Sequence, residues 1–224
     1  MLNIDPLSLI IRAPVVIFSL TLHEFAHGWV AWKCGDDTAL KAGRLTFNPL
    51  AHLDVVGTIC LFLGPLGWAK PVPIDPSKFH HPRRDDILVS GAGVAVNFAL
   101  AAGLAILARI LVWREIFPQT EFGQIGWAMM GEAIFLNFGL AVFNLLPVFP
   151  LDGSHIVRNL LPLNAATRFA QLSRYGGLLL LGIIILSMNV PFLSWPIIKL
   201  MLAFTGDDAA GVVVHFMMKY HLFS

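Results

Sequence analysis

Long apolar stretches separated by short polar segments dominate this chain. A helix needs roughly 20 mostly apolar residues to cross a bilayer, and four stretches reach that length: residues 7–32, 87–113, 123–149 and 175–202. Asn189, Pro191, Pro196 and Lys199 interrupt the fourth stretch. It therefore predicts either one broken helix or a spanning helix followed by an interfacial one. Residues 209–218 are apolar but too short to span.

A fifth apolar stretch, residues 55–69, has a different character. A helix of that length, at about 1.5 Å per residue, falls short of a ~30 Å hydrocarbon core. The stretch also contains three glycines and a proline, which disfavour a regular helix. We expect residues 41–75 to form an irregular or partly extended segment that dips into the membrane. At that depth, non-helical backbone must be buried in protein or line a wet cavity.

The composition agrees with a membrane protein. Of the 224 residues, 57% are hydrophobic and 13% are charged, and the mean hydropathy is +0.74. A soluble domain has about 25% charged residues, so this balance excludes an ordinary soluble protein, and it also excludes a disordered chain. Fifteen basic and 14 acidic residues leave no positive excess for binding nucleic acid.

We therefore predict an all-α polytopic protein embedded in the lipid bilayer, with residues 1–224 forming a single integral-membrane domain. It should contain four to six transmembrane helices, with a small membrane-associated β or re-entrant segment between the first two spans. Nothing in the sequence predicts an oligomeric state.

The distribution of basic residues predicts the orientation, because cytoplasmic loops carry an excess of lysine and arginine. Seven basic residues lie between the first and second stretches, and three lie between the third and fourth. Only Arg114 lies between the second and third. The first and third connections are therefore expected to face the cytoplasm, and the N-terminus the outside, in a multi-pass protein of the cell (plasma) membrane.

The first stretch contains the motif His23-Glu24-Phe25-Ala26-His27. Two imidazoles four residues apart lie on one face of a helix and can bind the same Zn²⁺. Glu24 lies at the flank of that face, where its carboxylate can act as a general base toward water. The competing interpretation is that these polar residues hydrogen-bond across the helix bundle, but packing does not require this spacing.

Hydrolytic zinc usually has three protein ligands and one open position, so a third ligand must come from elsewhere. Asp152 is the best candidate, because it is the only acidic residue between Glu132 and Asp207 and directly follows the third apolar stretch. It should also lie on the cytoplasmic side, where the first stretch ends shortly after His27. The alternative is a simple Asp-Gly turn at a helix exit.

These motifs together resemble the site-2 proteases, a family of intramembrane zinc metalloproteases. The resemblance lies in HEFAH within a transmembrane helix, the run Gly91-Ala-Gly-Val-Ala-Val-Asn97-Phe, and the pattern N-x-x-P-x-x-P-L-D-G from Asn144 to Gly153. GRLTFNPLAHLDVVGT and GWAKPVPI, within residues 43–74, resemble the compact subgroup that lacks a PDZ domain. The likeness covers residues 20 to 160. Ser154 departs from the second glycine that often follows Asp-Gly in the family.

The resemblance implies roles for individual residues. His23, His27 and Asp152 would bind one Zn²⁺ per chain, and Glu24 would be the general base and then the proton donor to the leaving amine. Asn144 would help to position or stabilise the reacting carbonyl. It lies seven residues after Asn137, on the same helix face, so interhelical hydrogen bonding is the alternative for it and is our expectation for Asn137 and Asn97.

We predict a zinc metalloprotease of the HExxH type that hydrolyses peptide bonds in or near transmembrane segments of a membrane protein or peptide, with its active site toward the cytoplasm. Short extended segments at Leu45–Phe47 and Ala69–Ile74 could bind unwound substrate by β-addition, or form a structural loop. The rival functions are a non-catalytic zinc-binding membrane module and a metal transporter. A transporter would spread its ligands along a path, whereas these ligands are predicted to form one compact cluster.

Overall fold

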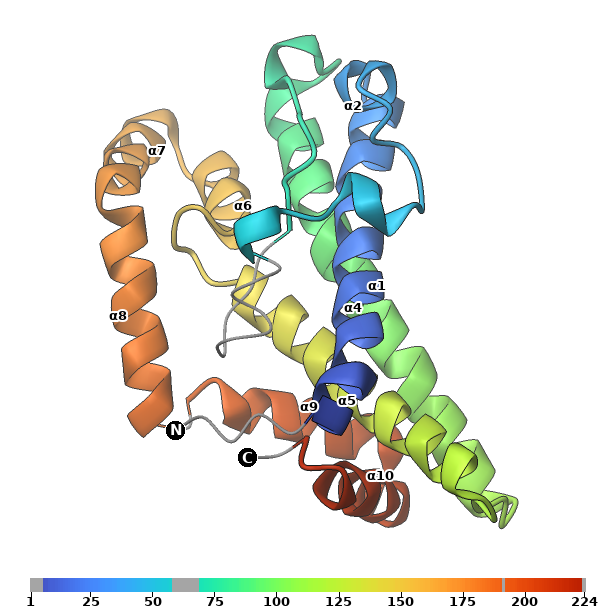
Figure 1. Ribbon diagram of the computed structural model, residues 1–224. Helices are drawn as coiled ribbons and strands as arrows, with labels where there is room; N and C mark the ends of the chain where they lie inside the picture. The colour runs from blue at the N-terminus through green and yellow to red at the C-terminus, as the bar shows by residue number, and fades with distance from the viewer. Residues whose placement is uncertain (1–5, 58–68, 191, 223–224) are drawn as a thin grey trace.

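The computed structural model describes residues 6–57, 69–190 and 192–222, and this part of the chain is largely helical (Figure 1). The long helices are α1 (Pro6–Lys33), α4 (Pro82–Trp113), α5 (Glu121–Asn144) and α8 (Gly176–Asn189). The shorter ones are α2 (Thr38–Lys41), α6 (Asp152–Leu160), α7 (Leu163–Ala170), α9 (Ser194–Thr205) and α10 (Asp207–Lys219). Three 3₁₀ turns are η1 (Pro49–Ala51), η2 (Pro76–Lys78) and η3 (Gln171–Tyr175).

Four helical segments in the described residues are long and apolar enough to cross a membrane, which agrees with four predicted spans, although the fourth begins at Leu163, 12 residues before the predicted start at residue 175. They are Pro6–Lys33, Pro82–Trp113, Glu121–Asn144 and Leu163–Ser187. The fourth runs through α7, η3 and α8, and it ends before the short helix α9. The 12 residues of α9 extend about 18 Å, so α9 is too short to span, and it lies across the foot of the bundle (Figure 1). This matches the second predicted alternative, a span followed by a separate helix.

Local sequence signals explain where α4 and α5 begin. The amide of His81, just before α4, donates to the Asp85 carboxylate (2.7 Å), and Pro82 occupies the first helical position, where its missing N–H is not needed. This cap starts α4 five residues before the apolar stretch begins. At α5 the hydroxyl of Thr120 accepts from the amide of Gly123 (3.1 Å), a standard N-cap.

Helices α1, α4 and α5 pack together as the centre of the molecule, and α9 and α10 close one end of it (Figure 1). The main apolar core lies between α4, α5, α9 and α10 and is built on a row of small residues on α4, including Ala101, Ala105 and Ala108. Small side chains let neighbouring helices approach closely. Near this end, Arg12 of α1 donates to the carboxylate of Glu132 of α5 (2.9 Å).

The predicted β segment between the first two spans is not confirmed. Among the described residues, the only β pairing is an isolated antiparallel bridge between Leu53 and Ala69, and residues 45–47 form bends. Residues 58–68, where the re-entrant portion was predicted, lie outside the described residues. Residues 70–75 have no regular secondary structure, and Val72 lies against α1 at Gly28.

Candidate metal centre

His23 and His27 lie on one face of α1, as the spacing predicted, and both side chains are buried. Their Nε2 atoms are 3.0 Å apart. His27 is six residues before the end of α1 at Lys33, which corresponds to about 9 Å along a helix. The pair therefore lies near the end of the bundle that carries α2, α6 and α7 (Figure 1).

Asp152 reaches the two histidines because the chain turns sharply after α5. Pro147 and Pro150 end the helical geometry, and α6 begins at Asp152 itself. A side chain at Gly153 would overlap the backbone of Leu145 and Leu146, which leaves room only for glycine. The buried Ser154 fits the turn, because its hydroxyl donates to the carbonyl of Leu151 (2.7 Å).

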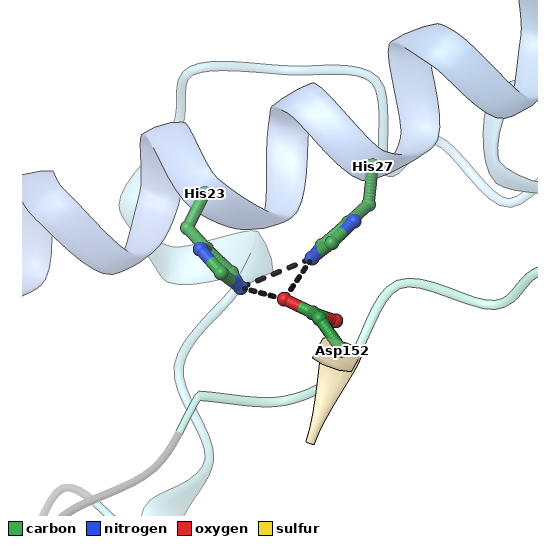
Figure 2. Close-up of side chains that lie close together, drawn as sticks. All are labelled: His23, His27 and Asp152. Carbon is green, nitrogen blue, oxygen red and sulfur yellow. Dashed lines mark hydrogen bonds and ion pairs between the residues drawn. The ribbon is translucent and has the colours of Figure 1, made fainter. Parts of the chain in front are cut away.

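Three side-chain atoms converge at this point (Figure 2). The Oδ2 atom of Asp152 lies 3.4 Å from each of the two Nε2 atoms. Zinc at about 2.05 Å from tetrahedral ligands separates those ligands by about 3.3 Å, so the observed triangle has the size of one face of such a site. Within the described residues, the three form the only group of histidine, cysteine and acidic side chains suited to hold a metal.

The proton position on the His27 ring also favours a cation. The Nδ1 atom of His27 lies 2.7 Å from the carbonyl oxygen of Val89, which can only accept, so this nitrogen carries the hydrogen. In a neutral ring, Nε2 then presents a lone pair. The Oδ2 atom of Asp152 is buried and has no hydrogen-bond donor among the described residues. Acceptor atoms that face one another in this way are stabilised by a positive ion between them.

The other two predicted site residues make different contacts. The Oε2 atom of Glu24 accepts a hydrogen bond from the amide of Val72 (2.8 Å), a contact that lies outside the triangle. The side-chain amide of Asn144 donates back to the carbonyl of Leu140 in its own helix (3.0 Å). Asn144 is the last residue of α5, eight residues before Asp152.

Comparisons with known proteins agree with this geometry. The model of peptidase family M50 matches residues 12–184. The chain belongs to peptidase family M50. A Bacillus subtilis relative named "Putative zinc metalloprotease YwhC" is 38% identical over 186 residues, which are 82% of this chain and 84% of that protein. Rip2 of Mycobacterium tuberculosis carries the same description and is 34% identical over 142 residues, 61% of this chain and 52% of Rip2.

A more distant relative, "Zinc metalloprotease MJ0392" of Methanocaldococcus jannaschii, is 22% identical over 204 residues, 89% of this chain and 49% of that protein. No solved structure matches the chain. Membership of family M50 confirms the predicted resemblance to the site-2 proteases. Together with four helices able to cross a membrane and the His/His/Asp group, it identifies an intramembrane zinc metalloprotease. The rival functions, a non-catalytic module and a transporter, are not favoured.

In this M50 peptidase, α4 holds both histidine rings through their Nδ1 atoms, which face away from the triangle. The Oδ1 atom of Asn97 lies 2.6 Å from Nδ1 of His23. Asn97 in turn donates to Asn137 of α5 (2.6 Å), and Asn137 donates to the hydroxyl of Ser19 on α1 (2.8 Å). The expected interhelical hydrogen bonds of Asn97 and Asn137 are thus confirmed. Such contacts fix the orientation and tautomer of a metal-binding imidazole.

Gly93 of α4 is a site residue that we did not single out from the sequence. A Cβ atom there would lie 2.5 Å from Cε1 of His23 and would also overlap Nε2 of His27. Val89, Gly93 and Asn97 are spaced four residues apart, so one face of α4 supplies a carbonyl, an open space and an amide to the two rings. That spacing was the sequence signal that could have revealed the face.

A separate set of polar contacts fixes the helix that carries Asp152. Asp86 of α4 accepts hydrogen bonds from Arg158 (2.8 Å) and Asn159 (2.5 Å) of α6, and Nδ1 of His155 is 3.7 Å from the same carboxylate oxygen. All three partners lie within two turns of Asp152. Because α6 has only nine residues, pinning it to α4 restricts where Asp152 can point.

Proposed function

We propose that this peptidase binds one Zn²⁺ through His23, His27 and Asp152 and uses the HExxH glutamate, Glu24, to hydrolyse peptide bonds in or near transmembrane segments of membrane proteins. The observation that carries the proposal is the buried triangle of two imidazole nitrogens and one carboxylate oxygen, 3.0–3.4 Å on each side, in which no donor from the described part of the chain reaches the oxygen. Its ligand set, two histidines and one carboxylate, suits a hydrolytic zinc site with one open position.

The chain's own groups divide the reaction between them. Bound zinc would supply Lewis-acid polarisation of the scissile carbonyl and acidification of water. Glu24 removes a proton from the attacking water as the C–O bond forms, and it later delivers that proton to the nitrogen of the leaving amine as the C–N bond breaks. The α4 contacts to the two imidazoles keep the ligand nitrogens in place through both steps.

Asn144 fits a role at the reacting carbonyl. An amide donor aimed at a developing oxyanion typically contributes about 2.7–4 kcal/mol, as measured in a serine protease. The side chain of Asn144 is partly exposed, and its amide donates to the carbonyl of Leu140 in its own helix, so a rotation of the side chain would free this donor for substrate. The role therefore requires the substrate carbonyl to replace the carbonyl of Leu140 as the acceptor for the Asn144 amide.

We further propose that the site opens toward the cytoplasm of a cell membrane and that residues 1–224 act as one domain. The basic residues between α1 and α4 and around α6, α7 and η3 lie at the same end of the bundle as the histidines (Figure 1), and cytoplasmic ends are rich in such residues. The extended chain near α1 at residues 69–74 would offer backbone groups to unwound substrate.

The decisive experiment measures zinc and cleavage in the same preparations. Protein without a histidine tag is purified in detergent, and zinc per chain is determined for wild type, for His23→Ala/His27→Ala and for Asp152→Ala. The matched control is His80→Ala/His215→Ala, which removes two exposed imidazoles. We expect close to one zinc in wild type and control, little in the first variant and weakened retention in the second.

Cleavage of a transmembrane reporter in proteoliposomes then tests Glu24. Glu24→Gln should keep its zinc and lose at least a hundredfold in kcat, the usual contribution of a general base. Zinc contents that do not differ between wild type and the ligand variants would refute the metal site. Substantial turnover by Glu24→Gln would refute the assignment of the base.

A further inference from the structure

Residues 69–75, Ala-Lys-Pro-Val-Pro-Ile-Asp, pass close to Glu24 and Gly28 on α1 and are here called the strap. The backbone of the strap is held at both ends. The amide of Lys70 donates to the carbonyl of His52 (2.8 Å), and the guanidinium of the buried Arg44 donates to the carbonyl of Lys70 (2.7 Å). At the far end, the amide of Asp75 donates to Asp36 (2.7 Å).

The centre of the strap is held against α1 by packing. The side chain of Val72 is buried and lies over Gly28, where an added Cβ atom would be only 3.1 Å from its Cγ1 atom. Gly28 is one turn from Glu24 along α1. The absence of a side chain at residue 28 therefore sets how closely the strap approaches the carboxylate.

The strap offers a single backbone donor at this point. Pro71 and Pro73 have no N–H, so the amide of Val72 is the only one between Lys70 and Ile74. That amide donates to Oε2 of Glu24 (2.8 Å). A proline on each side confines this part of the chain to extended geometry, which keeps the donor aimed at the carboxylate.

We propose that the Val72 amide is a positioning group for the catalytic base, an inference that rests on the proposed role of Glu24. A glutamate carboxylate turns easily about its last torsion, which has a broad, two-fold preference. The bond to Oε2 fixes that rotation and leaves the other oxygen, Oε1, to exchange the proton with water and with the leaving amine. The strap then acts on turnover through Glu24 without touching the metal.

Val72→Pro tests this because it removes the N–H, and the flanking prolines already favour the extended backbone that it needs at residue 72. The substitution also replaces the buried isopropyl group and places the ring Cδ next to Oε2 of Glu24. Val72→Ala is the matched control, because it keeps the N–H and removes the packing on Gly28. With a transmembrane reporter in proteoliposomes, we expect Val72→Pro to lose roughly 10- to 100-fold in kcat, the effect of a misplaced catalytic group. Its KM and zinc content should stay at the wild-type values, and Val72→Ala, which keeps the donor but loses packing, should lose clearly less in kcat than Val72→Pro.

A purely structural role for the strap gives a different pattern, in which both variants lose zinc or raise KM in proportion to their packing defect. That pattern, or a kcat for Val72→Pro equal to that of Val72→Ala, overturns the proposal. If Val72→Pro does not fold, a backbone ester at residue 72, which replaces only the N–H, is measured instead, with the same expected loss of kcat. Glu24→Gln separates the two hypotheses: if it is inactive while the ester is fully active, the base assignment stands and only the positioning role fails.

Discussion

Gly93→Ala should destroy the metal site while leaving the helix that carries it intact. The new Cβ atom would lie 2.5 Å from Cε1 and 2.7 Å from Nδ1 of His23, and it would also overlap Nε2 of His27. Ordinary contacts of this kind are 3.4–4 Å, so the overlap is about 1 Å. The rings cannot turn aside easily, because each Nδ1 atom is hydrogen-bonded to α4: that of His23 to Asn97 and that of His27 to the carbonyl of Val89.

The expected effect on zinc follows from that overlap. Ligand distances in a zinc site hold to about ±0.2 Å, and a displacement of about 1 Å exceeds this several-fold. Loss of a group that merely orients a ligand weakens metal affinity by about 10- to 100-fold. Displacing the ligand nitrogens themselves should weaken metal affinity by the larger of these factors or more. We therefore expect zinc to bind at least about 100-fold more weakly to Gly93→Ala.

Competition with a chelator of known affinity measures this change in purified protein, and zinc per chain after dialysis gives an independent reading. Gly91→Ala is the matched control, because it lies on the same helix with nothing within 4 Å of its added Cβ atom. Alanine is also favoured over glycine in a helix by roughly 0.5–1 kcal/mol. The control should therefore bind zinc normally and unfold at the same or a higher temperature.

One outcome would refute the reasoning. If Gly93→Ala is folded and binds zinc with wild-type affinity, then the two imidazoles do not bind zinc in the arrangement described. A Gly93→Ala variant that fails to fold while Gly91→Ala folds would instead show that the helices separate before the two rings move, which again places residue 93 directly against the imidazoles.

Two further predictions test the groups around the site. Asn97→Ala removes the acceptor for Nδ1 of His23 and should weaken zinc binding about 10-fold or more, whereas Asn97→Asp keeps an acceptor and should bind zinc more tightly than the alanine variant; equal affinities in chelator competition would contradict the orienting role. In the loop after α1, burial opposes ionisation of the Asp36 carboxyl, but hydrogen bonds from Thr38 and Asp75 hold its pKa below the usual 3.8. Because this pKa is lower in the folded than in the unfolded state, the Asp36 carboxylate stabilises the folded protein above about pH 4. This stabilisation is lost as the pH falls through the folded-state pKa. Asp36→Asn should flatten the pH dependence of the unfolding temperature below pH 4, and an unchanged acid dependence would rule this out.

Much of the helical framework was readable because each signal is local. The apolar runs predicted three spans within a few residues, and the start of α4 shifted only because His81 and Asp85 form a cap outside the apolar run. The fourth stretch left two alternatives, since proline and polar residues can either kink a helix or end it. Packing against α4 and α5 decided for a separate helix α9.

The β segment is the part of the predicted fold that the structure does not confirm. Residues 69–74 contain an apolar run that predicts either a strand edge or a structural loop. Strand pairing depends on a partner that is distant in sequence, and prolines at 71 and 73 remove two donors from the ladder. The described residues therefore hold one bridge at Leu53 and Ala69, and the amide of Val72 bonds to Glu24 instead.

The sequence by itself determined the relative directions of three side chains on the first helix. His23 and His27 lie on one face with Glu24 on its flank, because the helical repeat alone fixes those directions. It also indicated Asp152, because few other acidic residues were available. Only the tertiary structure decided how these groups are held. The carbonyl of Val89, the open space at Gly93, the amide of Asn97 and the carboxylate of Asp86 act across helix interfaces, and no local pattern specifies which faces of α1, α4 and α6 meet. That choice depends on side-chain packing along the whole length of the helices, where small residues such as those on α4 set the distance of approach.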